Sequence, residues 1–272
     1  MTKRIETADE AKQDAAYSEA LKELIYQMAD DDFIVSFRGS EWLGLAPHIE
    51  EDVAFSSITQ NTMGHAVMYY NLLEELGEGD ADALAHARPL EKRRNAVYLE
   101  KQNGDGSYLK EPYFDWALTV VRHYFYEVLK KVKLEALTKS SYVPLANIAQ
   151  KVLMEQPYHL AHWKLWIRQL QNSNEDAKSR INMRIVEAWK EFGDALELGT
   201  KSSEMVQHEL IAGEEFLQKQ WLNEVKATVM SLPTYPLEKG LGNGRNGKHS
   251  ADLKQAIKIF SEVYESDREA VW

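Results

Sequence analysis

Apolar residues recur along most of the chain at alternating spacings of three and four, a period that predicts helices rather than strands. The pattern defines four long helices, at about 21–46, 49–76, 113–137 and 144–171. The first is expected to stop before Pro47, because the proline ring and the missing N–H end a helix. Helices of this length predict a long-helix bundle, since each must bury its apolar stripe against the others.

The rest of the chain adds shorter elements to this bundle. Further helices are predicted at about 176–198 and 203–230, then an irregular Gly- and Pro-rich stretch, then a last helix at about 250–265 that is capped by its first residue, a serine. Residues 97–99 are a candidate for a brief extended segment. Pro157 lies inside the fourth long helix and predicts a kink there.

Composition supports this picture and excludes several classes of protein. The 272 residues include only 14 Gly and 7 Pro, and no internal repeat or low-complexity linker is present, so a single all-α domain over residues 1–272 is predicted. The chain has no cysteine, which excludes Cys-ligated zinc, Cys-held iron–sulfur clusters and a thiol nucleophile. Its formal charge of −11 argues against nucleic-acid binding, which needs clustered Lys and Arg.

Neither an export signal nor a membrane span is expected. Residues 1–16 are charged and polar and lack the apolar core of a signal peptide. Residues 53–73 contain no Asp, Glu, Lys or Arg, but they carry too many Ser, Thr, Asn and Gln side chains for hydrocarbon. We therefore expect a cytoplasmic protein in which this segment is a helix buried among other helices.

Polar residues interrupt the apolar stripe near the middle of each long helix. When each stripe is followed along its helix, the interruptions are Asp31, His65, Glu127, Glu155 and His159. Polar groups inside a bundle are costly unless they pair or bind something. The middle of the bundle is therefore the candidate functional site.

The spacing of these residues resembles an eroded dinuclear metal site. A di-iron bundle uses one Glu from each of two helices and Glu-x-x-His from each of the other two. Here Thr62 stands where the second helix needs a carboxylate, and Tyr158 stands where the fourth helix needs a histidine, with His159 one position later. A polar core whose groups satisfy one another is the favoured interpretation, with no metal held, while an occupied dinuclear or mononuclear site stays open.

Short motifs lie along nearly the whole chain from about residue 26 onward. They are Ala29-Asp30, Trp42-Leu43-Gly44, Ala46-Pro47, Glu51-Asp52-Val53-Ala54, Gly64-His65-Ala66, Leu76-Gly77-Glu78-Gly79-Asp80, Arg122-His123-Tyr124-Phe125, Glu155, Tyr158-His159-Leu160, Trp166, Gly244-Arg245-x-Gly247-x-His249-Ser250 and Trp272. Each motif is weak alone, but their order and spacing are specific, and together they resemble the C subunits of bacterial phenylacetyl-CoA epoxidases (ring 1,2-phenylacetyl-CoA epoxidases). Residues 1–25 lie outside the resemblance and are either a polar extension or a longer first helix.

The resemblance implies a ferritin-like bundle with additional C-terminal helices. It implies a structural, non-catalytic subunit of a multicomponent di-iron monooxygenase that epoxidises phenylacetyl-CoA in aerobic phenylacetate breakdown. The implied partners are a catalytic subunit that holds the di-iron centre, a small subunit, and a reductase with FAD and an iron–sulfur cluster. This chain would then hold no cofactor and meet the substrate only indirectly. Two alternatives remain open: a ferritin-like di-metal oxygenase or oxidase in its own right, and an unrelated helical adaptor.

A glycine motif near the C-terminus admits two interpretations. Residues 242–247 match Gly-x-Gly-x-x-Gly, but no strand precedes them as the dinucleotide-binding unit requires. The loop 240–249 is therefore expected at the surface. Its Arg245, Lys248 and His249 could meet an acidic partner or a CoA phosphate, although a solvated loop is the simpler interpretation.

A lysine cluster and a histidine pair are both expected to be structural and not binding sites. Lys130, Lys131 and Lys133 are expected to form a solvated helix face. His159 and His162 share one helix edge, a spacing that can hold a metal, but packing of a core histidine among aromatic rings is the favoured interpretation.

Overall fold

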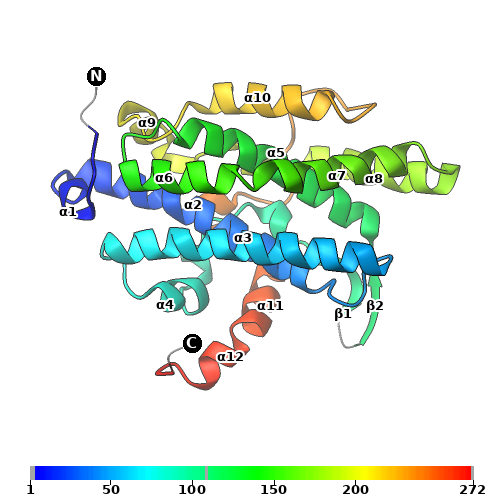
Figure 1. Cartoon of the computed structure of the whole chain (residues 1–272), viewed down its shortest axis with the longest axis horizontal. Coiled ribbons are helices and arrows are strands. Elements are labelled where there is room, and N and C mark those ends of the chain that lie inside the picture. Colours follow the sequence, from blue (N-terminus) through cyan, green and yellow to red (C-terminus); the bar gives the residue numbers. More distant parts are fainter. Residues whose placement is uncertain (1–3, 108–109, 271–272) are drawn as a thin grey trace.

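A computed structural model describes residues 4–107 and 110–270 of the chain. Trp272, the last residue of the resemblance, lies outside the described residues. The predicted all-α fold is confirmed: four long helical segments form an antiparallel bundle consistent with a ferritin-like arrangement (Figure 1). These segments are α2 (Ala15–Ser40), α3 (Ile49–Glu75), α5 (Trp116–Leu137) and the pair α6 (Val143–Leu153) and α7 (Gln156–Gln171).

The bundle is built from two helical hairpins. Helix α2 packs along α3, and α5 packs against both α6 and α7. Polar side chains cap the helices locally: Asp14, His48 and Asp115 accept backbone N–H groups at the starts of α2, α3 and α5. Large aromatic rings such as Trp163 and Tyr124 are fully buried between the helices, and this burial of apolar area provides most of the driving force.

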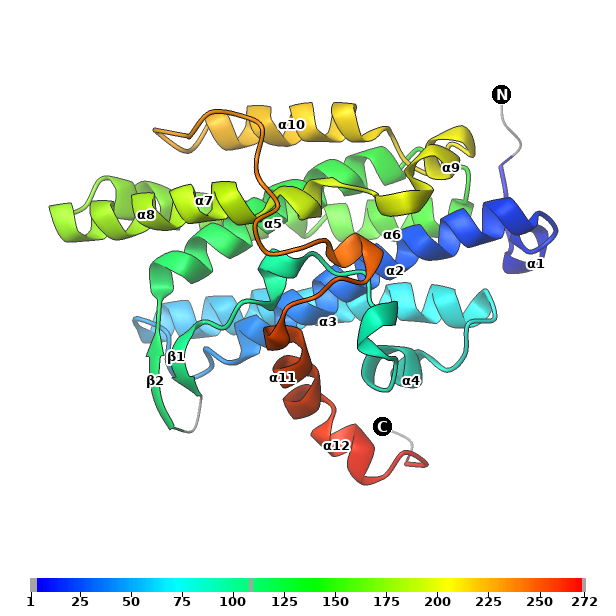
Figure 2. The ribbon, with the colours of Figure 1, turned by 180° about the vertical axis from the view of Figure 1, so that it is seen from behind.

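The remaining elements surround the bundle. Helices α8 and α10 pack on α5, and the segment after α10 runs across the molecule to α11, as seen from behind in Figure 2. The helices are α1 (Ala8–Ala11), α4 (Ala81–His86), α8 (Glu175–Glu191), α9 (Ser202–Gln207), α10 (Glu214–Lys226), α11 (Ala251–Phe260) and α12 (Glu262–Ser266). A small hairpin joins β1 (Gly104–Ser107) to β2 (Lys110–Phe114).

The distortion predicted at Pro157 is present as a complete break. Helix α6 ends at Leu153, and α7 begins at Gln156, so that Pro157 lies in the first turn of a new helix. A proline is tolerated there because the first N–H groups of a helix have no partner within it. The break leaves Glu155 at the junction, within reach of His65.

Other boundaries differ from the prediction. Residues 97–99 are not extended but belong to the 3-10 helix η2 (Val97–Glu100). The helix predicted at 203–230 is interrupted between α9 and α10, where Gly213 serves as the N-cap of α10. Helix α8 ends at Glu191, before Gly193, whose backbone packs against the carbonyl of Glu238.

The N-terminal segment contributes to the fold. Helix α2 already starts at Ala15, and Leu21 and Leu24 are fully buried, so residues 15–25 form a longer first helix. Ile5 forms a parallel bridge with Tyr142 at the start of α6. Within the described ranges, none of the helices combines the length and apolarity that crossing a bilayer demands.

Candidate functional site

The polar middle of the bundle brings together side chains from all four long segments. His65 of α3, Glu127 of α5, Glu155 at the α6–α7 junction and His159 of α7 meet there, as predicted. From α2, however, the side chain that enters this cluster is Asp32. We call these five residues, together with Lys130 of α5, the polar seam.

Lys130 is the central connection of the seam. Its ammonium donates to Asp32 Oδ1 at 2.7 Å and to His65 Nδ1 at 2.8 Å. Because Nδ1 of His65 accepts this bond, the ring proton is on Nε2, which lies 2.9 Å from Oε2 of Glu155. A continuous chain of hydrogen bonds therefore runs from the half-exposed Glu155 to the buried Asp32.

Burial and the charge of Lys130 determine which of these hydrogen-bonded side chains are protonated. Burial and the neighbouring ammonium lower the pKa of His65 to about 2, so this ring is neutral at pH 7. Burial raises the pKa of Asp32 to about 6, although Lys130 and the hydroxyl of Tyr126, 2.6 Å from Oδ1, oppose that shift. Both shifts reflect the cost of charge in a low-dielectric interior; the ammonium of Lys130 adds to that cost for a protonated His65 and reduces it for an ionised Asp32.

Glu127 and His159 form a second, looser pair beside the hydrogen bonds that link Glu155 to Asp32. The Nδ1 of His159 lies 3.4 Å from Oε1 of Glu127, while Gln156 Nε2 donates to Oε2 of the same carboxylate at 2.8 Å. Burial alone would raise the pKa of Glu127, but His159, Lys130 and the Gln156 amide lower it well below its usual range. Although His159 is buried, neither of its ring nitrogens has a hydrogen-bond partner among the described residues.

Asp31, the residue of α2 predicted to face the seam, points toward the C-terminal segment instead. Its carboxylate accepts two hydrogen bonds from Arg245, at 2.9 and 2.7 Å, and one from the backbone N–H of Ala96 at 2.8 Å. Adjacent helical residues are turned about 100° apart, so a one-residue error in register exchanges Asp31 for Asp32. Both carboxylates are buried, which is why the apolar pattern could not separate them.

The seam does not fit the dinuclear metal centre that the fold implies. Both nitrogens of His65 are already used, and the hydroxyl of Thr62 donates to its own helix at Ile58. The ammonium of Lys130 occupies the position between Asp32 and His65. In the described ranges, no three or more His, Asp or Glu side chains converge in a way that could hold a metal ion.

The lysine cluster of α5 differs from the predicted solvated face. Lys130 and Lys133 are buried, and only Lys131 of the three lies near the surface, where it pairs with Glu224 at 2.7 Å. Burial lowers the pKa of Lys133 to about 7, even though Asp31 lies 4.0 Å away. The spacing could have revealed Lys130, because Glu127 and Lys130 are three residues apart and share a helix face.

The glycine motif is also placed differently from the prediction. Gly244 and Arg245 of the 3-10 helix η5 (Gly244–Asn246) are buried, and the loop closes over Asp31 and Asp194. The N–H of Gly244 donates to Asp194, as does that of Val97. The motif therefore packs inside the protein and stabilises the fold, and Arg245 is not free to bind a partner or a phosphate.

A further polar contact joins α3 to α7 near the end of the bundle. Glu51, which is buried, accepts from His162 Nε2 at 2.9 Å and from Trp166 Nε1 at 2.6 Å. His162 therefore binds Glu51 and does not share a metal site with His159. Glu51 could not be recognised from the sequence, because acidic residues at a helix start are usually exposed and interact with the helix dipole.

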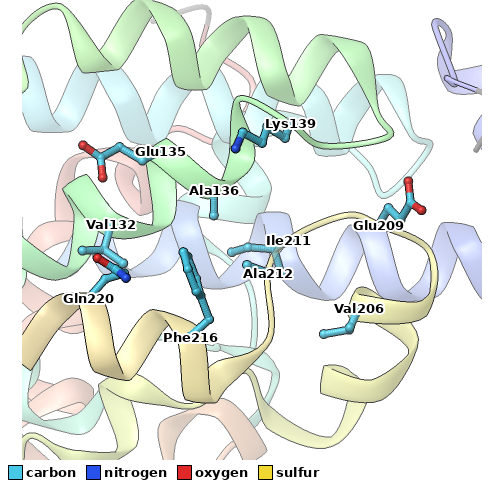
Figure 3. Close-up of a pocket in the computed structure, with 10 residues that line it drawn as sticks. All are labelled: Val132, Glu135, Ala136, Lys139, Val206, Glu209, Ile211, Ala212, Phe216 and Gln220. Atoms are coloured by element: carbon cyan, nitrogen blue, oxygen red, sulfur yellow. The ribbon is translucent and has the colours of Figure 1, made fainter. Parts of the chain in front are cut away.

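A surface pocket lies outside the seam, between α5 and the α9–α10 connection (Figure 3). Its volume is about 550 Å³, and its walls are mainly apolar, with Phe216 pointing into it and Glu135, Lys139 and Glu209 at its edges. Asp31, His65, Glu127, Glu155 and His159 are not among the residues that line it. The pocket and the polar seam are therefore separate features.

The buried ring of His123 in α5 is expected to make the stability of the protein depend on pH. Burial lowers its pKa to about 3, below the value of about 6.5 expected in the unfolded chain. Between these values only the unfolded chain binds the proton, so stability is lost as the pH falls below 6.5. Measured by urea unfolding from pH 8 to pH 5, the stability difference between wild type and His123→Gln should stay constant above pH 6.5 and shrink by about 1.4 kcal/mol per pH unit below it. A constant difference over this range would contradict a buried neutral ring.

Comparison with known proteins identifies the family to which the chain belongs. The sequence profile of a family described as phenylacetic acid catabolic protein matches residues 1–272. The chain belongs to this family. A similar protein is the C subunit of the 1,2-phenylacetyl-CoA epoxidase of Escherichia coli (strain K12), which is 28% identical over 233 residues, 84% of this chain and 89% of the relative. The resemblance found in the short motifs is thereby confirmed.

Proposed function

We propose that this chain is a structural, non-catalytic subunit of a phenylacetyl-CoA 1,2-epoxidase that acts in aerobic phenylacetate breakdown. Membership of the phenylacetic acid catabolic family and the similarity to an epoxidase C subunit support this proposal. The observation that carries its non-catalytic part is Lys130, whose ammonium lies between Asp32 and His65. A cationic side chain in that place repels metal ions and uses the donor atoms that they would need.

A second candidate is a metal-dependent oxygenase or oxidase in its own right. One observation favours it: His159 is buried beside Glu127, and both of its ring nitrogens lack a partner within the described residues. One imidazole and one carboxylate are too few for a dinuclear centre, which needs four carboxylates and two imidazoles. We therefore place the catalytic role on a partner chain.

The proposed complex assigns the missing chemistry to other subunits. A catalytic subunit would hold the di-iron centre and bind phenylacetyl-CoA, while a small subunit and a reductase with FAD and an iron–sulfur cluster would complete the system in the cytoplasm. This chain would then contribute rigidity and a docking surface. The relative is named as one subunit of an epoxidase, which supports membership of a larger assembly.

The outer face of α3 has the character of such a docking surface. The segment was predicted to be buried among helices, but only one side of α3 is covered, and Val53 and Val67 are 65% and 49% exposed. From Val53 to Asn71, about 27 Å of helix, the exposed residues carry no charge. By contrast, the solvent side of α8 carries charged residues such as Asp176 and Arg180, which form an ion pair.

The outer side of α6–α7 adds exposed apolar side chains to this surface. Helices α3 and α6–α7 lie side by side on the face that Figure 1 turns to the viewer, joined by the His65–Glu155 contact. The exposed Met154, Tyr158 and Leu165 add apolar area along the outer side of α6–α7. Interface centres are depleted of charge and enriched in aromatic residues and methionine, so the α3–α7 face suits the helical catalytic subunit.

The assembly is tested with the cognate catalytic subunit. We expect the two chains, co-expressed, to elute together in size-exclusion chromatography at micromolar concentration. Val67→Asp places an unpaired charge in the α3–α7 face and should weaken the complex by about 100-fold, about 3 kcal/mol. Binding is measured by isothermal titration calorimetry.

Met230→Asp is the matched control, because Met230 is equally apolar and 66% exposed but lies outside the α3–α7 face. It should leave the affinity unchanged. Separate elution of both wild-type chains would reject the proposed function. If instead the chain alone forms a dimer that Val67→Asp dissociates, the face serves a second copy rather than the catalytic subunit.

A further inference from the structure

We propose that the free edge of β1 is a docking site for an extended segment of another protein, which adds to the β1–β2 hairpin as a third strand. The segment would lie in the groove between the hairpin and α11. None of the described residues that line this groove belongs to α3, α6 or α7. The site is therefore separate from the α3–α7 face, and the inference does not depend on the proposed function.

The groove lies between two parts of the fold that project from the same side of the bundle. The hairpin borders it on one side, and α11 with the start of α12 borders it on the other (Figures 1 and 2). Residues at the end of α2 complete the lining, and the volume is about 550 Å³. We call it the hairpin groove; its lining includes Phe37, Leu43, Gly104, Gly106, Ile259 and Glu262.

The backbone of β1 is available for pairing along this groove. Strands β1 and β2 form a two-stranded sheet, and in both views β1 lies on the side of the hairpin that faces α11 (Figures 1 and 2). Within the described ranges, the backbone hydrogen bonds of residues 104–107 go only to β2. The other edge of β1 therefore presents unpaired N–H and C=O groups, which are the groups that an added strand binds.

The two strands differ in how they resist pairing at their outer edges. Strand β2 carries Lys110 and Pro112, and lysine and proline are residues that block the addition of a strand to an edge. Strand β1 reads Gly-Asp-Gly-Ser and contains neither. Its pairing is also irregular between Asp105 and Ser107, where Gly106, which lines the groove, has no partner residue in β2. The edge of β1 is therefore the open one.

The groove offers an apolar surface to the side chains of an added strand. Leu43 and Ile259 are 54% and 49% exposed, and Phe37 also belongs to the lining. The side chains of a strand point alternately to its two faces, so every second side chain of the occupant would contact this surface. Apolar residues are therefore expected at alternate positions of the occupant.

Charge further defines the occupant. The charged side chains among the described lining residues are Arg38, Glu41 and Glu262. Arg38 is buried and pairs with Glu41 at 3.1 Å, so these two charges offset each other. Glu262 remains on the helical side of the groove, and Asp105 of β1 adds a second carboxylate on the hairpin side. Basic side chains complement this charge, so the occupant is an extended segment in which apolar and basic residues alternate.

The experiment uses the full chain and the blocked hexapeptide Lys-Val-Lys-Val-Lys-Val as the probe. We expect a dissociation constant of about 0.1 mM, measured by fluorescence anisotropy of the labelled peptide. Hydrogen exchange followed by mass spectrometry should slow at residues 104–107 when the peptide is bound. The same peptide with methylated backbone nitrogens keeps its side chains but cannot donate hydrogen bonds, so it should bind at least about 10-fold more weakly.

Further controls separate the groove from the rest of the surface. Ile259→Ala removes an apolar contact and should weaken binding of the lysine–valine peptide by about 5-fold. Val186→Ala is the matched control, because Val186 is similarly exposed but lies on α8, and it should leave the affinity unchanged. The peptide Glu-Val-Glu-Val-Glu-Val should bind at least about 10-fold more weakly than the lysine peptide, because its carboxylates meet Asp105 and Glu262.

Each contrary result overturns the proposal. If the peptide does not bind at about 1 mM, or if it binds without slowing exchange at residues 104–107, no strand adds to β1. Equal affinity for the methylated peptide would show that backbone pairing is not used. Equal effects of Ile259→Ala and Val186→Ala would place the peptide outside the hairpin groove. If the chain alone dimerises and the dimer protects residues 104–107, a second copy is the occupant rather than another protein.

Discussion

Replacing Arg245 by alanine is expected to lower the free energy of unfolding by about 3–5 kcal/mol, because it leaves a buried carboxylate without its partner. Arg245 is fully buried and donates two hydrogen bonds to Asp31. It also donates to the carbonyls of Arg94 and Ala195, so its loss frees several acceptors at once. Urea unfolding followed by circular dichroism measures the effect.

A double-mutant cycle isolates the ion pair from the other contacts of Arg245. Asp31→Asn combined with Arg245→Ala should cost less than the sum of the two single changes, because the uncompensated charge is gone. Arg268→Ala is the matched control: its partner Glu265 is exposed, and the loss should stay below about 1 kcal/mol. A cost that small for Arg245→Ala would mean that the C-terminal segment does not close over Asp31.

Gly244→Ala is expected to destabilise the protein by at least about 3 kcal/mol, more than overpacking of a side-chain contact usually costs. A Cβ atom on Gly244 would overlap the carbonyl oxygen of Asn95. The obstacle is backbone, so rotation of a side chain cannot relieve it. The melting temperature measures the loss.

Gly64→Ala is the opposite case and serves as the control. Gly64 lies in the middle of α3, and an added Cβ would meet no atom of the described residues within 4 Å outside its own stretch of helix. Alanine costs less conformational entropy than glycine in a helix, so this variant should gain about 0.5–1 kcal/mol. Equal effects at Gly64 and Gly244 would contradict the packing described for the loop.

The bundle could be predicted because its signals are local. Periodic apolar residues, caps and prolines define helices within a few turns, and α3, α5 and the α6–α7 break appear close to where they were expected. The exact residue that α2 contributes to the seam could not be predicted in the same way. Asp30, Asp31 and Asp32 are consecutive and all buried, and their separate partners, Arg88, Arg245 and Lys130, come from distant parts of the chain.

The lysines and the glycine motif show the same limit. A charged side chain is usually solvated, so Lys130 and Lys133 were expected at the surface, and nothing near them in sequence indicates Asp32 or Asp31 as partners. Likewise, the Gly-x-Gly-x-x-Gly pattern indicates close backbone approach but not to what. Gly244 approaches the backbone at Asn95 rather than a phosphate, and that contact depends on tertiary structure.

The distance along the chain between Asp31 and Arg245 has a consequence for the order of folding. The two residues are 214 positions apart, so on the ribosome the first bundle helices emerge long before the arginine that neutralises Asp31. Until then, the Asp31 carboxylate has only the N–H of Ala96 and the more distant ammonium of Lys133 beside it. The last tenth of the chain therefore completes the buried ion pair, and a chain that ends before residue 245 would fold with Asp31 lacking its arginine.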